Sequence, residues 1–275
     1  MVQKNKAMVR SIRVRRWQGT TQRTLFDAMA VEEPLEIRVN DFSLAVTMRT
    51  PGQDAELAVG FLATESILRG PDDLFDVTSC ADPAHPGIRN FINVYTAPER
   101  VPGDFRRITQ RYSNSSCGLC GRATIEQAFA ASPPLASDML LSRKTIALLP
   151  ERLQAVQHMF SKTGGLHAAG LFSVHGELIC AAEDIGRHNA VDKVIGHALM
   201  SGYWPLHETV LMVSGRTAFE IIQKALAVRI PAVCAISAAS TLAVELARKS
   251  GMILIGFLRG DSMNVYSGMD RVISD

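Results

Sequence analysis

The sequence predicts an α/β fold, and the last third of the chain carries the main observation. Three continuous apolar runs, over residues 210–213, 232–236 and 253–257, have the length and composition of strands buried on both faces of a parallel sheet. The segments between them, 218–228 and 241–249, have helical patterns, so the order is βαβαβ. In the first third, apolar and polar residues alternate, which predicts a smaller N-terminal α+β domain.

The first predicted elements are the two strands of a hairpin. Apolar residues alternate with polar ones over 35–39 and again over 44–48, and Asn40-Asp41 favours a turn between them. Apolar residues at helical spacing then predict a helix over 54–68. A further strand is expected over 91–94.

A proline-rich break at Ser132-Pro133-Pro134 predicts the domain boundary. The N-terminal domain, residues 1–132, would end in a mobile loop with two cysteines and its helix over 122–131, and the α/β domain would be 133–275. Three elements are expected before the βαβαβ unit: a helix over 150–160 with Pro150 in its first turn and Gly164-Gly165 at its end, a hairpin with strands over 171–174 and 178–181, and a helix over 189–200.

The composition excludes several classes of protein. Of the 275 residues, 47% are hydrophobic and 20% are charged, as in soluble globular proteins. A net charge of +2 argues against a general nucleic-acid binder. No apolar run reaches the length of about 18 residues that a membrane span needs, and the N-terminus lacks an apolar signal-peptide core. We therefore expect a cytoplasmic protein that binds neither nucleic acid nor membrane.

The charge is concentrated at the N-terminus. Residues 1–24 contain seven lysines and arginines and no acidic residue. One interpretation is a solvated, partly disordered terminus, and the other is a segment that docks on an acidic partner or cofactor.

The five cysteines are too few, and odd in number, for a secreted disulfide scaffold. Cys180 and Cys234 lie in apolar runs and are expected in the core. Cys80 has no evident role. Cys117 and Cys120 are separated by two residues among glycines and serines, where little side-chain bulk can bury a thiol, so these are the expected reactive cysteines.

The helix predicted over 122–131 would place this pair at a helix N-terminus, which favours a thiolate. The helix dipole stabilises an anion by about 0.3–1 kcal/mol, which is less than one pKa unit. A strongly nucleophilic Cys117 therefore needs a further positive charge. The candidates in the sequence are Arg106, Arg107, Arg111 and Arg122.

Four chemistries use a C-x-x-C pair. A structural zinc site needs two further ligands, and no second C-x-x-C or H-x-x-x-H exists. A thioredoxin-type pair normally follows a strand, whereas Ser-Asn-Ser-Ser precedes Cys117. A zinc deaminase would need a proline before Cys117 and a glutamate two residues after His167, and both are absent. The fourth chemistry is sulfur relay, in which an exposed thiolate accepts sulfane sulfur and passes it on.

The ends of the three predicted parallel strands carry loops of small and polar residues, and ligands of such sheets bind at this edge. The loops are Ser214-Gly215-Arg216, 237–240 and 258–262. Arginines in two of them and helix N-termini after two of them favour an anionic, phosphorylated ligand, although ordinary turns would explain the same residues. Neither G-x-G-x-x-G nor G-x-x-x-x-G-K-[ST] is present, which argues against a common dinucleotide or P-loop site.

A polar cluster over residues 183–193 contains acids, an arginine, a histidine and a lysine around the start of a predicted helix. It predicts either the lining of a site or surface decoration. His167 could join it, although a core histidine is the other interpretation.

Together, five motifs resemble the formate dehydrogenase accessory sulfurtransferase (FdhD) family. In chain order they are Ser-Cys-Gly-Leu-Cys-Gly at 116–121, Glu-Asp-Ile-Gly-Arg-His-Asn-Ala-Val-Asp-Lys at 183–193, Ser-Gly-Arg at 214–216, Ser-Ala-Ala-Ser-Thr-Leu-Ala at 237–243 and Gly-Phe-Leu-Arg-Gly at 256–260. One such motif is weak, but five in order over most of the chain are specific.

The resemblance implies a sulfurtransferase, a sulfur carrier that receives persulfide sulfur from a cysteine desulfurase. The acceptor would be the molybdenum bis(molybdopterin guanine dinucleotide) cofactor of formate dehydrogenase, bound as a substrate, with no intrinsic metal. Cys117 becomes the persulfide-bearing cysteine and Cys120 its partner. The cofactor-binding segment becomes Phe257, Leu258, Arg259, Gly260, Asp261 and Ser262.

The resemblance also implies a main domain that is a three-layer α/β/α sheet like the cytidine deaminase fold, without that enzyme's zinc, and a homodimer. Two other functions stay open. The first is a non-catalytic chaperone for formate dehydrogenase, which binds the molybdenum cofactor and senses redox state through its C-x-x-C pair. The second is a thiol-disulfide oxidoreductase.

Overall fold

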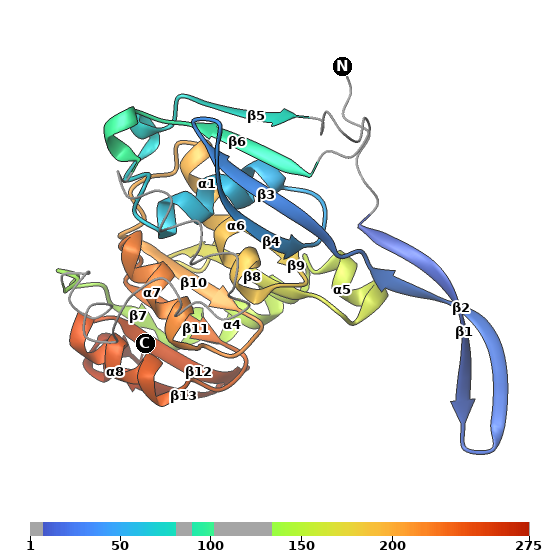
Figure 1. Ribbon diagram of the computed structural model, residues 1–275. Helices are drawn as coiled ribbons and strands as arrows, with labels where there is room; N and C mark the ends of the chain where they lie inside the picture. The colour runs from blue at the N-terminus through green and yellow to red at the C-terminus, as the bar shows by residue number, and fades with distance from the viewer. Residues whose placement is uncertain (1–7, 81–89, 102–133, 275) are drawn as a thin grey trace.

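The computed structural model describes residues 8–80, 90–101 and 134–274 of the 275-residue chain. The fold is α/β, with two main sheets, helices between and around them, and a long two-stranded arm (Figure 1). The loop with Cys117 and Cys120 and the helix expected after it lie outside the described residues. In the described part of the chain, no helix is long and apolar enough to cross a membrane.

The larger sheet has six strands in the order β13-β12-β11-β10-β8-β9. Its strands are β8 (His167–Ser173), β9 (Leu178–Asp184), β10 (Thr209–Val213), β11 (Ala232–Ala235), β12 (Ile253–Arg259) and β13 (Ser262–Ser267). β10, β11 and β12 are parallel, which confirms the predicted βαβαβ unit. The predicted hairpin is confirmed as β8 and β9, and β13 is a further antiparallel edge strand.

This sheet has helices on both faces, so three layers form. Leu211 and Val213 of β10 share a core with α6 (Arg187–Met200), α7 (Phe219–Ala227) and α8 (Thr241–Ser250). The alternate residues of β10, Val210 and Met212, face the other way and share a second core with α4 (Arg143–Gln154). The three-layer arrangement is therefore present, and the likeness to cytidine deaminase stays a prediction.

The smaller sheet has four strands in the order β4-β3-β6-β5. They are β3 (Glu33–Val39), β4 (Phe42–Arg49), β5 (Asp76–Cys80) and β6 (Phe91–Tyr95). The predicted hairpin and the predicted strand over 91–94 are confirmed, while β5 was not expected. Helix α1 (Asp54–Thr64) ends before the predicted residue 68, because Ser66 adopts a left-handed conformation with φ of 63°.

Helices α1 and α6 join the two sheets. At Gly60 of α1 an added Cβ would overlap the backbone carbonyl of Asp192, and at Gly196 of α6 it would overlap that of Glu56. The missing side chains let the two helix backbones touch, and one continuous core extends from Leu35 of β3 to Leu211 of β10. The predicted boundary at Ser132-Pro133 lies outside the described residues.

Residues 9–30 form an arm, so this part of the N-terminal segment is not the disordered tail that one interpretation expected. Strands β1 (Val9–Gln18) and β2 (Thr21–Ala30) pair over their whole length and extend away from the body (Figure 1). Apolar residues alternate with the arginines of β1, so the segment has a strand pattern that its charge obscures. Trp17 and Phe26 are 61% and 72% exposed.

The helix predicted over 150–160 was wrong in its bounds. Helix α4 begins at Arg143, where Ser142 caps it by accepting from the Thr145 backbone N–H at 3.4 Å, and Pro150 lies inside the helix. Ile146, Leu149 and Leu153 are buried, and this apolar face outweighs the backbone bond that the proline removes. A separate helix, α5 (His158–Thr163), ends at Gly164 as expected.

The remaining elements are short. They are η1 (Pro71–Asp73), η2 (Pro98–Arg100), η3 (Met269–Arg271), and the strands β7 (Leu141–Ser142) and β14 (Val272–Ile273), which pair with each other. The predicted helix over 189–200 is confirmed as α6.

Candidate functional site

A cavity of about 680 Å³ opens at the carboxyl ends of β10, β11 and β12. This edge of a parallel sheet is where ligands of such folds bind, and it is where the sequence places the candidate loops. The strand ends contribute Ser214, Ile236, Leu258 and Arg259, and the facing wall consists of Pro150, Gln154, Gln157, Phe160, Gly164, Gly165, Leu166 and His167.

The predicted cofactor-binding segment, 257–262, forms the end of β12 and the turn into β13. An irregularity in the β12–β13 pairing between Gly256 and Arg259 alters the alternation of side chains. Leu258 is fully buried, Arg259 is exposed, and both line the cavity. Phe257 is 42% exposed with a left-handed backbone, φ 51°, and 260–262 are exposed in the turn, outside the residues that line the cavity.

The facing wall comes from α4, α5 and the start of β8, and most of its residues were not predicted. Its position depends on a contact between distant parts of the chain. The Glu183 carboxylate of β9 accepts hydrogen bonds from the backbone N–H groups of Met159 at 2.8 Å and Phe160 at 2.6 Å, which caps α5. Among the residues of this wall, the sequence indicated a special role only for Gly164-Gly165 and His167.

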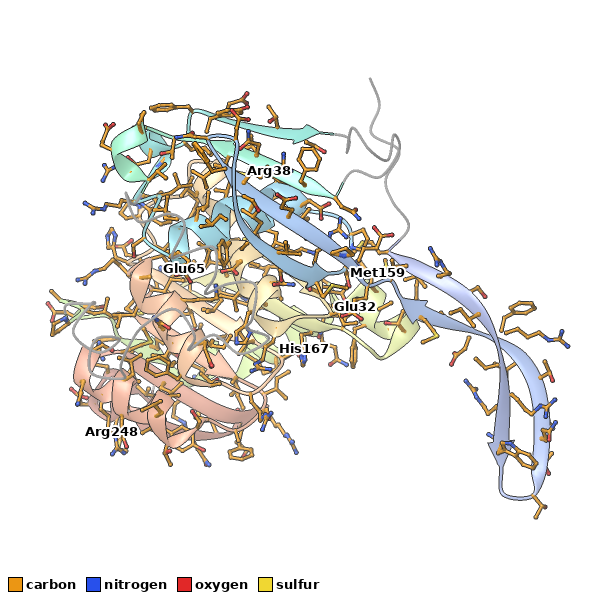
Figure 2. All side chains as sticks on the ribbon, viewed as in Figure 1. Glu32, Arg38, Glu65, Met159, His167 and Arg248 are labelled. Atoms are coloured by element: carbon orange, nitrogen blue, oxygen red, sulfur yellow. The ribbon has the colours of Figure 1, made fainter. Side chains whose placement is uncertain are left out.

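His167, the first residue of β8, is not a core histidine. The residue is only partly buried, it borders the cavity, and Figure 2 labels it in the body of the molecule. Burial, and next the positive charge of Arg187, lower the pKa of His167 below its usual 6.5, while Asp184 opposes them. The neutral imidazole can donate one hydrogen bond and accept one.

Three arginines give this edge of the sheet its charge. Arg259 lines the cavity, Arg187 lies beside His167 across Gly215, and Arg216 follows Gly215 in the loop after β10. None of the three forms an ion pair or side-chain hydrogen bond in the described part of the chain. Unpaired guanidinium groups beside apolar Ile236 favour an anion with an apolar or ring portion.

Some of the hydroxyl groups at this edge have structural roles instead. The Ser214 hydroxyl accepts from the backbone N–H of Ala168 at 2.9 Å, which holds the β10 loop to β8. The Ser240 hydroxyl accepts from the backbone N–H of Ala243 at 3.2 Å and caps α8. The explanation of these loops as turns and caps therefore holds for these two serines.

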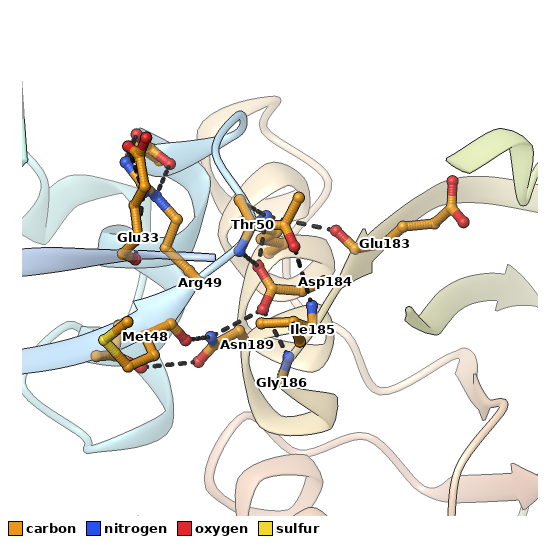
Figure 3. A network of polar contacts seen from close by, with 12 residues as sticks. Glu33, Met48, Arg49, Thr50, Glu183, Asp184, Ile185, Gly186 and Asn189 are labelled. Carbon is orange, nitrogen blue, oxygen red and sulfur yellow. Dashed lines mark hydrogen bonds and ion pairs between the residues drawn. The ribbon is translucent and has the colours of Figure 1, made fainter. Parts of the chain in front are cut away.

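The polar cluster over 183–193 is mainly a buried network that ties β4 to α6 (Figure 3). Asp184 forms an ion pair with Lys193 at 2.7 Å, and both side chains are fully buried. The same carboxylate accepts from the backbone N–H groups of Thr50 at 3.1 Å and Gly186 at 2.8 Å. Asn189 donates to Asp184 at 2.9 Å and to the Met48 carbonyl at 2.8 Å.

Asp192 belongs to a second buried group, in which Lys224 lies 2.8 Å from its carboxylate and Thr64 donates to it at 2.9 Å. These residues are therefore neither surface decoration nor free to line a site. Arg187 and His188 differ from them, because Arg187 Nε and His188 Nε2 are buried without a hydrogen-bond partner in the described part of the chain.

Cys180 and Cys234 are unsuited to thiol chemistry. Burial raises the pKa of the Cys180 and Cys234 thiols to about 12, and both lie in the core or against it, as predicted. Cys117 and Cys120 lie outside the described residues. Within the described ranges no three His, Cys, Asp or Glu side chains gather as a metal site would require.

Comparisons with known proteins agree with the resemblance. The model of the FdhD/NarQ family matches residues 30–273. A protein named sulfur carrier protein FdhD from Streptomyces avermitilis is 49% identical over 251 residues, which cover 90% of this chain and 89% of that protein. A protein of the same name from Mycobacterium tuberculosis is 46% identical over 253 residues, covering 90% of this chain and 92% of that one.

A solved structure shares the fold. It is the crystal structure of a protein described as a formate dehydrogenase accessory protein from Desulfotalea psychrophila, with a TM-score of 0.76 and 22% identity, and it covers 97% of this chain and all of that one. The family match over 244 of 275 residues and the relatives at almost half identity confirm what the five motifs indicated. The chain belongs to the FdhD/NarQ family.

Proposed function

We propose that this protein is a sulfurtransferase, a sulfur carrier that receives persulfide sulfur from a cysteine desulfurase and delivers it to the molybdenum bis(molybdopterin guanine dinucleotide) cofactor of formate dehydrogenase. The observation that carries the proposal is a cavity at the ends of three parallel strands, in a chain of the FdhD/NarQ family. The cavity is bordered by Arg259, which has no ion-pair partner among the described residues. The relatives named sulfur carrier protein support the same role.

The chemistry of loading falls to Cys117. Its thiolate attacks the terminal sulfur of the donor persulfide, the sulfur–sulfur bond breaks, and the donor cysteine leaves as a thiolate. The step needs no oxidant, because one persulfide replaces another. Cys120 has two possible roles. It either donates a hydrogen bond that stabilises the Cys117 thiolate, or, once Cys117 is loaded, its thiolate attacks the Sγ atom of Cys117, which breaks the bond to the terminal sulfur, releases that sulfur as sulfide and leaves a Cys117–Cys120 disulfide.

The cavity supplies the acceptor site in this proposal. The cofactor is a substrate with guanine bases and pyrophosphates, and a cavity with Arg259 beside apolar Leu258 and Ile236 suits such a molecule. Phe257 and 260–262 would contact the parts of the ligand that extend from the cavity.

Mass spectrometry of the intact protein tests the loading step. After incubation with a cysteine desulfurase and cysteine, we expect a reductant-sensitive gain of about 32 Da per sulfur on Cys117 and no gain in Cys117→Ala. Cys234→Ala is the matched control and should load like wild type, because burial makes that thiol inert. A wild type that never loads would favour the cofactor-binding chaperone, whose cysteines only sense redox state.

Calorimetry with GDP as a fragment of the cofactor tests the acceptor site. We expect Arg259→Ala to weaken GDP binding by about tenfold, the effect of one charge-assisted hydrogen bond. If Arg259→Ala binds GDP with the affinity of wild type, Arg259 does not contact the nucleotide.

We further propose that the protein is a homodimer, and the arm supports this. A two-stranded ribbon is marginal in water by itself, and this one exposes Trp17 and Phe26. The arm is basic and the rest of the chain is acidic, so the arm suits a second copy of this chain.

A further inference from the structure

Arg187, the first residue of α6, stands out among the charged residues of its cluster. Asp184, Asp192 and Lys193 all have partners at hydrogen-bond distance. Arg187 has none in the described part of the chain, and its Nε atom is buried. A buried N–H group without an acceptor is costly, so its persistence calls for an acceptor that the described part of the chain does not supply.

A glycine lies beside both Arg187 and His167. An added Cβ at Gly215 would lie 3.3 Å from Nδ1 of His167 and 3.8 Å from Cβ of Arg187. The φ of Gly215 is not left-handed, so the backbone does not require glycine there. The missing side chain instead lets the His167 ring lie against the loop after β10, close to Arg187 and at the edge of the cavity that His167 lines.

Arg187 and the polar groups around it favour an oxyanion. The start of α6 already has an anion, because the Asp184 carboxylate accepts from the Gly186 backbone N–H at 2.8 Å, whereas the Arg187 guanidinium has none among the described residues. His188 follows Arg187, and its buried Nε2 also lacks a hydrogen-bond partner in the described part of the chain. Thr217, two residues beyond Gly215, is fully buried with an unpartnered hydroxyl in the described part of the chain.

We infer that Arg187 and His167, which both lie beside Gly215, form a subsite for a phosphate oxyanion of the ligand that occupies the cavity. The inference rests on the proposed function, since it concerns the nucleotide portion of the cofactor, and it adds a subsite outside the segment 257–262. Arg187 supplies the charge and a fork of donors, and His167 supplies one further hydrogen bond.

Calorimetry with GDP and guanosine separates this subsite from the rest of the cavity. We expect Arg187→Gln to weaken GDP binding by about tenfold and to leave guanosine binding unchanged, because guanosine has no phosphate. Gly215→Ala, which adds a Cβ only 3.3 Å from Nδ1 of His167 without changing charge, should displace the imidazole and weaken GDP binding selectively as well. Arg143→Gln is the matched control, because Arg143 is an exposed arginine at the far end of α4, and should bind both probes like wild type.

Each other outcome has a distinct meaning. If wild type binds GDP and both Arg187→Gln and Gly215→Ala bind it equally well, the subsite is wrong and the proposed function stands. If Arg187→Gln loses GDP and guanosine equally, Arg187 shapes the cavity and does not hold phosphate, which also overturns the inference. If wild type binds neither probe, the nucleotide-binding part of the proposed function fails and this inference fails with it. Should Arg187→Gln not fold, Gly215→Ala gives the same comparison.

Discussion

His188 is a partly buried histidine, with its Nε2 atom buried, that remains neutral at ordinary pH. Burial, together with the positive charges of Lys224 and Arg187 and with His167, lowers its pKa to about 3. In the unfolded chain a histidine has a pKa of about 6.5. Between these values the unfolded chain binds a proton that the folded chain does not, so the stability contributed above pH 6.5 is lost as the pH falls.

We therefore predict that wild type loses about 2 kcal/mol of unfolding free energy between pH 7.5 and pH 5 through this residue. His188→Gln should not lose this part of its unfolding free energy. The difference in unfolding free energy between wild type and His188→Gln should therefore be smaller at pH 5 than at pH 7.5. Urea denaturation at both pH values measures it. His175→Gln, at an exposed histidine in the β8–β9 turn, is the control. Parallel pH profiles for wild type and His188→Gln would contradict the prediction.

The ion pair of Asp184 and Lys193 gives a second prediction for single residues. Two charges in a dry core gain little net stability from each other, but removing one partner leaves the other uncompensated. We expect Lys193→Met to lower the unfolding free energy by about 3 kcal/mol, the low end for such a loss, because Asp184 keeps three other donors.

Chemical denaturation tests this, with Lys162→Met at an exposed lysine of α5 as the control that should change little. The double variant Asp184→Asn with Lys193→Met should recover part of the loss, because no buried charge remains. A Lys193→Met protein as stable as wild type would mean that Asp184 is satisfied without its partner.

Among the helices, the contact of α1 with α6 can be tested by one methyl group. Alanine is better than glycine inside a helix by about 1 kcal/mol, so propensity alone favours Gly196→Ala. The added Cβ, however, would overlap the Glu56 carbonyl, and a backbone atom cannot rotate away. We expect a net loss of about 2 kcal/mol in unfolding free energy, because overpacking outweighs propensity.

Thermal or urea denaturation of Gly196→Ala and Gly60→Ala would measure this loss. Gly165→Ala is the matched control, since its nearest neighbour would be 3.9 Å away, and should stay within about 0.5 kcal/mol of wild type. A Gly196→Ala variant that is more stable than wild type would show that α1 and α6 can move apart without a loss of unfolding free energy.

The elements differ in how far the sequence predicts them, for physical reasons. Strands β10, β11 and β12 are predictable because both of their faces are buried over 210–213, 232–235 and 253–255, where every residue is apolar. The arm is not, because arginines between its apolar residues resemble a solvated tail. The helix around Pro150 was placed too late, because tertiary burial of Leu149 and Leu153 outweighs a proline signal that is purely local.

The same distinction applies to the candidate site. Leu258 and Arg259 are predictable, because parallel strands must end at one edge of their sheet. The opposite wall at Gln154, Gln157 and Phe160 is not, since it is held by Glu183 from a distant strand. Spacing in the sequence also cannot show that Lys193 is paired while Arg187 has no partner within the described ranges.

At the scale of the whole molecule, charge is divided between the arm and the body. Residues 1–30 hold seven of the 29 basic residues and one of the 27 acidic ones, so the rest of the chain has 22 basic and 26 acidic side chains. In the proposed dimer, the basic arm of one copy would therefore be attracted to the acidic remainder of the other. The apolar arm residues that water now surrounds, Trp17 and Phe26, would be buried by the same contact.

We therefore predict that the double variant Trp17→Ser with Phe26→Ser shifts the protein from dimer to monomer, at least tenfold in dissociation constant, because both aromatic contacts with the second copy are lost. Sedimentation or light scattering over a range of protein concentrations measures the shift, and high salt should act in the same direction because the contact is partly electrostatic. Phe75→Ser, at an aromatic residue that is 64% exposed outside the arm, is the control and should leave the dimer intact. A wild type that stays monomeric, or a double variant that dimerises like wild type, would show that the arm serves a partner other than this chain.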